Sequence, residues 1–186
     1  METTELPIPE KERYTYADYA ELSEGAPYEL IDGDLVGSPA PTPYHQTIQS
    51  NLFFALSQFV RERNLGRVFS APIDIRLSDQ DTVQPDLAFI AQDRVDIVGE
   101  QALEGAPDLI VEILSPATAH RDLTTKKRLY EKHGVQEYWI VDPESTTVEV
   151  FQNTDDGFHQ HARVVESGTA ASALLDGLRI DLGNVF

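Results

Sequence analysis

The spacing of apolar residues predicts a hairpin and a long helix in the N-terminal part of the chain. Two alternating runs flank Asp32-Gly33, a pair typical of a two-residue turn, so strands are expected over Tyr28–Ile31 and Asp34–Gly37. After the proline-rich "SPAPTPY", apolar residues recur every three or four positions up to Gly66, which predicts an amphipathic helix. Its apolar positions are Ile48, Leu52, Ala55, Leu56, Phe59 and Val60.

The following apolar runs predict a sheet. "RVFSAPIDIRLSD" alternates, "VQPDLAFIAQ" supplies a further strand, and "DLIVEILSP" is apolar on both faces, as in a buried central strand. A helix in "HRDLTTKKRLYEKHG" and a strand in "VQEYWIVDP" come next, and this strand–helix–strand order favours a right-handed parallel crossover. The C-terminal part looks like a hairpin and a last apolar segment. We therefore expect an α/β fold with a mixed sheet and helices on its faces.

The length of the chain favours one compact domain. It has 186 residues, enough for a substantial core but not for two large domains, and it contains no internal repeat. Residues 1–13 are polar and interrupted by proline, which predicts a flexible N-terminal arm. Residues 14–186 are expected to form a single domain.

Composition limits the chemistry and the compartment. The chain has no cysteine, which excludes disulfides and thiolate metal sites. Neither a secretory apolar region nor a membrane-length apolar segment is present, so a soluble cytoplasmic protein is expected. The formal net charge of −18 repels polyanions on average and argues against nucleic acid as a partner. A local basic patch or bound divalent cations can reverse the sign at one site.

Glu112 interrupts the most apolar run of the chain. Alternate side chains of a strand share a face, so Glu112 lies on the same side as Ile110 and Leu114, in a covered layer or a cleft. An isolated buried carboxylate costs several kcal/mol unless it is protonated, hydrogen-bonded or paired with a cation. A compensating partner is therefore expected.

Asp86 and Lys126 are the candidate partners. Asp86 follows a proline at the start of a strand that is expected to neighbour the Glu112 strand, and two close carboxylates are commonly held by a divalent metal ion. On a helix with about 100° per residue, Lys126 falls near the middle of the inward arc. That arc contains Ala119, Leu123, Leu129 and Tyr130.

Each of these residues alone also has a structural explanation. An aspartate after proline often belongs to a turn, and a helical lysine usually extends towards solvent. A single metal-dependent active centre, however, accounts for Asp86, Glu112 and Lys126 together. By contrast, the chelating spacing of His159 and His161 fits the solvated edge of a hairpin better than a metal site.

The order of these residues resembles the PD-(D/E)XK nuclease superfamily. In the usual motif the lysine lies two residues after the glutamate, where this chain has Leu114, but some branches are thought to carry it on the following helix, as Lys126 would be. From Tyr14 to the C-terminus, the chain resembles more closely the Uma-two family of restriction endonucleases. The segments that carry this resemblance are "YELIDGDL", "VQPDLAFI", "LIVEILSP", "RDLTTKKRLYEKHGVQEYWIVDP" and "LLDGLRIDL".

The resemblance implies a restriction endonuclease-like fold and hydrolysis of DNA phosphodiester bonds. Mg²⁺, or Mn²⁺ in its place, would be held by Asp86, Glu112 and a strand carbonyl near Ile113, with Lys126 acting on the water or the phosphate. It also adds Glu29 and His45 to the catalytic pocket. Gln84 and Asp122 are expected to support these groups, whereas Tyr130 is expected in the core.

Two functions remain open from the sequence. The first is a metal-dependent endonuclease, for which a homodimer would suit cutting of both DNA strands. The second is a catalytically silent binding or regulatory module with the nuclease fold, also dimeric. The net charge of −18 and the lack of an arginine-rich segment that would read DNA support the second.

Overall fold

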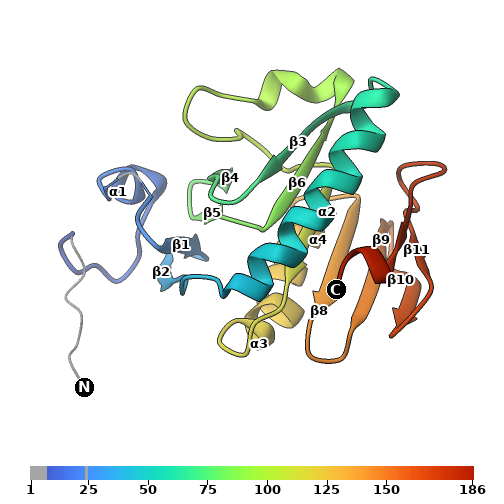
Figure 1. The fold of residues 1–186 in the computed structure, drawn as a ribbon. Helices are drawn as coiled ribbons and strands as arrows, with labels where there is room; N and C mark the ends of the chain where they lie inside the picture. The colour runs from blue at the N-terminus through green and yellow to red at the C-terminus, as the bar shows by residue number, and fades with distance from the viewer. Residues whose placement is uncertain (1–7, 24) are drawn as a thin grey trace.

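The computed structural model of the chain describes residues 8–23 and 25–186, which form a larger six-stranded sheet, a smaller four-stranded sheet and a two-stranded sheet near the C-terminus, with helices around them (Figure 1). The predicted N-terminal arm is only partly described. Its residues 1–7 lie outside the described residues, whereas residues 8–13 form no helix or strand. Ile8 is buried in a small apolar cluster with Tyr14, Tyr19 and Leu30.

The smaller sheet has four strands in the order β2-β1-β5-β4, and all its pairs are antiparallel. The predicted hairpin is confirmed, because Ile31 pairs with Asp34 across a two-residue turn. Asp32 and Gly33 have φ values of 51° and 80°, which this turn requires. The elements of this part are α1 (Tyr16–Tyr19), β1 (Tyr28–Ile31), β2 (Asp34–Gly37), β4 (Ile75–Ser78) and β5 (Asp81–Val83).

The larger sheet has six strands in the order β10-β9-β8-β7-β6-β3. The β7–β8 pair is parallel and the other pairs are antiparallel, so the predicted mixed sheet and parallel crossover are confirmed. The strand expected over residues 67–79 is instead two strands in different sheets, because the chain turns away after Ser70. The six strands are β3 (Gly66–Ser70), β6 (Leu87–Ala91), β7 (Leu109–Ile113), β8 (Glu137–Asp142), β9 (Thr147–Thr154) and β10 (Gly157–Val165).

Helix α2, Pro43–Glu62, covers one face of the larger sheet (Figure 1). It begins at Pro43 rather than at the expected His45, because Thr42 Oγ1 accepts the backbone N–H of His45 at 3.2 Å and proline takes the first helical position. The C-terminal segment packs on the same face. Its elements are β11 (Thr169–Ala171), β12 (Arg179–Asp181) and the short helix η3 (Leu182–Asn184).

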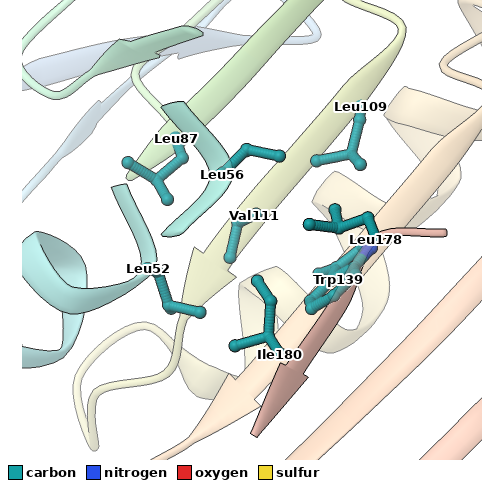
Figure 2. A pocket seen from close by; sticks show the side chains of 8 residues that line it. All are labelled: Leu52, Leu56, Leu87, Leu109, Val111, Trp139, Leu178 and Ile180. Carbon is teal, nitrogen blue, oxygen red and sulfur yellow. The ribbon is translucent and has the colours of Figure 1, made fainter. Parts of the chain in front are cut away.

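The core beneath α2 is mainly apolar, with the buried carboxylate of Glu137 bonded to Trp139 within it. Figure 2 shows side chains from α2, the central strands and the C-terminal segment converging on one point. Burial of this layer removes large apolar side chains from water at about 25 cal/mol per Å² and holds the sheet against the helix. The converging residues are Leu52, Leu56, Leu87, Leu109, Val111, Trp139, Leu178 and Ile180.

The opposite face of the larger sheet is covered by α4 and the smaller sheet. Ile110 of β7 packs there with Ile31 and Leu129, while Leu109 and Val111 belong to the layer under α2. The predicted division of the β7 strand into two faces is thereby confirmed, and it directs Glu112 towards the smaller sheet. Besides α1, α2 and η3, the helical elements are η1 (Gln92–Ile97), α3 (Ala119–Arg121), η2 (Asp122–Lys126) and α4 (Lys127–Lys132).

Candidate active site

A cleft of about 900 Å³ opens where β1, the start of α2, the end of β7 and η2 meet. All residues that the sequence singled out for the site line this one cleft, although they come from separate parts of the chain. They are Glu29, His45, Gln84, Asp86, Glu112, Ile113, Asp122 and Lys126.

Asp86 is fixed at the point where the chain enters β6. Its Oδ1 lies 2.7 Å from Nε2 of His45, and its Oδ2 accepts the backbone N–H of Ile113 at 2.7 Å. Its carbonyl oxygen accepts from Gln49 Nε2 at 3.1 Å and from the N–H of Ala71 at 2.9 Å. The carboxylate is thus tied directly to the residue after Glu112 in the neighbouring strand.

Glu112 has almost no contact with water, and it is compensated by two donors. Its Oε1 accepts from the hydroxyl of Tyr130 at 2.6 Å and lies 2.6 Å from Nζ of Lys126. Within the described chain, Oε2 receives no hydrogen bond. The partner that the apolar run required is therefore Lys126, together with Tyr130.

Glu29 enters the same cluster from the smaller sheet. It is 1% exposed, so it is not the exposed strand residue that its position in a short hairpin would otherwise suggest. Oε1 accepts the N–H of Gln84 at 2.8 Å and lies 2.9 Å from Lys126 Nζ. Oε2 is buried without a hydrogen-bond partner and lies 3.6 Å from NH2 of Arg121.

Lys126 reaches these carboxylates because the helix changes its pitch. The segment Asp122–Lys126 is one turn of π-helix, a form that is rare and often found at functional sites. The hydroxyl of Tyr138 donates to the carbonyl oxygen of Asp122 at 3.1 Å and supports this turn. Asp122 and Lys126 both point inward, 3.8 Å apart, whereas Leu123 is 42% exposed. The inward position expected for Leu123 was wrong, because the helix does not keep a uniform period.

Burial and charge oppose each other in the cluster. Burial raises the pKa of Glu112 well above its ordinary value; Lys126 lowers it, but the neighbouring carboxylates raise it further. Burial by itself lowers the pKa of Lys126, yet the attraction of the surrounding carboxylates, Glu112 first, leaves it raised. Burial also raises the pKa of Asp122 against the attraction of Lys126. Lys126 is therefore held as an ammonium ion among excess acidic groups.

A network missed by the sequence reasoning lies behind Glu29. The side-chain amide of Gln84 donates to Asp74 Oδ1 at 2.7 Å and to the hydroxyl of Tyr19 at 3.2 Å, and Tyr19 donates to Asp74 at 2.8 Å. These bonds fix Gln84, whose backbone N–H holds Glu29. Neither Tyr19 nor Asp74 has a local sequence signal, because their roles depend on contacts between distant segments.

The remaining residues considered in the sequence analysis lie in the core or at the surface. Tyr130 is in the core as expected, and its bond to Glu112 was not foreseen. His159 and His161 are exposed on β10 and do not line the cleft.

The oxygen atoms at this site supply some, but not all, of the ligands that a hard divalent cation needs. Oε2 of Glu112 is unbonded within the described residues, and Asp86 keeps acceptor capacity beyond its two bonds, since a carboxylate has about four lone-pair sites. The N–H and C=O of one strand residue point to the same side, so the carbonyl of Ile113 faces Asp86. Across residues 8–23 and 25–186, no three acidic or histidine side chains form a metal cluster. A metal here would depend on two carboxylates and a backbone carbonyl.

Comparison with known proteins identifies the fold and the family of the chain. A mixed sheet covered by helices, with acidic residues at the ends of its central strands, defines a restriction endonuclease-like fold. The Uma2 family model, described as "Putative restriction endonuclease", matches residues 14–183, so the chain belongs to this family.

Among solved structures, the chain is similar to a putative nuclease of the DUF820 group from Anabaena variabilis. The TM-score is 0.75 and the identity 23%, over 92% of this chain and 97% of the other. No curated protein matches the chain. In the part of the chain that the structure describes, no helix is long and apolar enough to cross a membrane.

Proposed function

We propose that the protein is a metal-dependent endonuclease that hydrolyses phosphodiester bonds of DNA. One observation carries the proposal: Asp86 and Glu112 lie at the ends of adjacent strands, joined through the N–H of Ile113, with Lys126 against them in a cleft. Membership of a family described as restriction endonucleases supports the same activity.

Mg²⁺, or Mn²⁺ in its place, would be held by Asp86, Glu112 and the carbonyl of Ile113. When bound, the ion would polarise the phosphate, lower the pKa of a bound water and shield the substrate from the acidic residues. His45 keeps one oxygen of Asp86 in place, and Tyr130 does the same for Oε1 of Glu112.

Lys126 is suited to donate hydrogen bonds as a cation rather than to accept a proton as a base. Its raised pKa keeps the ammonium form, so it would stabilise negative charge that develops on the phosphate oxygens. Glu29 holds this ammonium from the smaller sheet, with Gln84 fixing Glu29. Asp122, one helical turn before Lys126, adds to the acidic field that keeps it charged.

The test is cleavage of supercoiled and linear duplex DNA by purified protein with Mg²⁺, with Mn²⁺ and with chelator. Cutting should require the metal and be abolished in Asp86→Ala, Glu112→Ala and Lys126→Ala. Equal cutting by the wild type and all three variants would refute the assignment.

A second candidate is a binding or regulatory module that keeps the fold without turnover. Two observations favour it: the net charge of −18, and the commitment of Lys126 to two carboxylates. Calorimetry with Mn²⁺ separates the candidates, because a module without a working site should show no binding that depends on Asp86 and Glu112.

We also propose that the endonuclease acts as a homodimer, since two centres related by a two-fold axis can cut both strands of a duplex. Light scattering coupled to size-exclusion chromatography tests this. A monomer at concentrations that sustain double-strand cutting would contradict it.

A further inference from the structure

The cleft contains few cations that could meet a phosphate. Among the described residues that line it, two carry a permanent positive charge, Lys126 and Arg121. The acidic residues of the same lining are Glu29, Asp86, Glu112, Asp122, Asp142 and Glu144. A polyanion that enters this cleft therefore depends strongly on how these two cations are used.

Lys126 is already committed. Its Nζ lies 2.6 Å from Glu112 and 2.9 Å from Glu29, and its side chain is 3% exposed. Moving it away from these carboxylates would leave both buried without a cation, which is costly, so Lys126 can act on a phosphate only from its present position and cannot move to hold the substrate.

Arg121 is held far less firmly. Its NH1 donates to the carbonyl oxygen of Gly37 at 3.3 Å, and its NH2 is 3.6 Å from Glu29 Oε2, both long contacts. Its Nε is buried without any hydrogen-bond partner, and the side chain is 18% exposed. A guanidinium with an unsatisfied N–H at a cleft wall has unused capacity for an acceptor.

We infer that Arg121 binds a phosphate group of the nucleic-acid substrate, exchanging its weak contact with Glu29 for a paired contact with two phosphate oxygens. A guanidinium is suited to this exchange, because its planar fork of donors matches two oxygens of a phosphate. This inference rests on the proposed function and adds to it the residue that holds the substrate. Nothing in the chemistry of the reaction passes through Arg121.

A purely structural role is the competing explanation, in which Arg121 only offsets the charge of Glu29. The two differ in one property. A phosphate contact releases counterions when DNA binds, so its loss changes the dependence of affinity on salt; a structural arginine changes stability alone.

The experiment measures binding of a short fluorescein-labelled duplex by anisotropy over a range of salt concentrations, with Ca²⁺ replacing Mg²⁺. The proteins are the wild type, Arg121→Gln, Arg121→Lys and the control Arg128→Gln. Arg128 lies about two helical turns further along the chain, is 74% exposed and does not line the cleft. Arg121→Gln should lower the slope of log K against log salt by about 0.9, the loss of one phosphate contact. Arg121→Lys should keep most of the slope, and Arg128→Gln all of it.

An unchanged slope in Arg121→Gln, with wild-type binding intact, would overturn this inference and leave the endonuclease proposal standing. If the wild type neither binds nor cuts the duplex, both fall.

A double-mutant cycle covers the case in which Arg121→Gln perturbs folding. If Glu29 competes with phosphate for Arg121, Glu29→Gln should tighten duplex binding more in the presence of Arg121 than in its absence. The same gain in both backgrounds would mean that Glu29 acts on binding without Arg121, and would overturn the exchange. Urea unfolding of each variant provides the check on folding.

Discussion

The ammonium of Lys126 lies 2.6 Å from Oε1 of Glu112, although one residue belongs to a turn of π-helix and the other to a central strand. Both side chains are almost fully buried. Burying either charge alone would cost free energy, and pairing the two offsets that cost. The pair is therefore needed for folding as well as being a candidate for catalysis.

Replacing Lys126 should therefore destabilise the protein markedly. Lys126→Met leaves Glu29 and Glu112 without their shared cation, and loss of one partner of a buried ion pair costs about 3–5 kcal/mol. Urea unfolding followed by the fluorescence of the one tryptophan measures this. Lys132→Ala, at an exposed position of α4, is the control and should change the free energy of unfolding by less than about 0.5 kcal/mol. If Lys126→Met changes the free energy of unfolding as little as Lys132→Ala does, the pair is not needed for stability.

The raised pKa of Glu112 predicts a pH dependence with a definite sign. Above the ordinary glutamate pKa of 4.5, the unfolded chain has lost this proton while the folded chain retains it. The contribution of Glu112 to stability should then fall as pH rises towards its folded pKa. The measurement is the difference in unfolding free energy between wild type and Glu112→Gln across this range. If the unfolding free energy of the wild type instead rises with pH relative to that of Glu112→Gln, the pKa of Glu112 in the folded protein is lowered.

The same shift predicts that metal binding strengthens with pH. A cation favours the ionised carboxylate, so binding at low pH must displace the proton of Glu112. Calorimetric titration with Mn²⁺ in buffers of different ionisation enthalpy should detect proton release on binding. No proton release anywhere below neutral pH would contradict a raised pKa of Glu112.

Tyr130→Phe should weaken the site while the core remains packed. The hydroxyl donates to Glu112 Oε1 at 2.6 Å, and loss of such a bond to a metal ligand typically costs about 10–100-fold in metal affinity or activity. The matched change is Tyr138→Phe, which removes a donor to the Asp122 carbonyl rather than to Glu112. It should affect Mn²⁺ affinity less. Equal losses in both variants would point to general disturbance of the core.

Glu137 offers a test of stability that is separate from the cleft. This buried carboxylate accepts from Trp139 Nε1 at 2.6 Å, from Ser172 Oγ at 2.7 Å and from the N–H groups of Ala173 and Leu174 at 2.6 and 2.8 Å. Glu137→Ala leaves these donors unsatisfied, at about 1–3 kcal/mol for each one that finds no water. The midpoint of urea unfolding should fall, while Mn²⁺ affinity of the folded protein stays the same. A change in that affinity would mean that the two regions are coupled.

Local patterns predicted much of the fold. Asp32-Gly33 specified the turn of the β1–β2 hairpin, and the continuous apolar run around Glu112 specified a central strand buried on both faces. The strand–helix–strand order specified the parallel β7–β8 pair. These features depend on backbone preference and periodicity, which neighbouring residues carry.

The parts that were missed depend on contacts between distant segments. Periodicity placed Leu123 inside and gave no sign of the π-helical turn, which Tyr138 supports from another strand. The run "RVFSAPIDIRLSD" alternates as one strand would, yet its two halves pair with different sheets. Arg121 looked like any charged helical residue, because only the folded chain brings it to Glu29.

Glu29 belongs to the smaller sheet, whereas Glu112 belongs to the larger one, and Lys126 joins them. The charged cluster is thus a seam between two halves of the molecule, where one ammonium group ties together a carboxylate from each half. Variation selected for a tighter seam would also change the candidate site, so at these three residues robustness and activity cannot be tuned independently of each other.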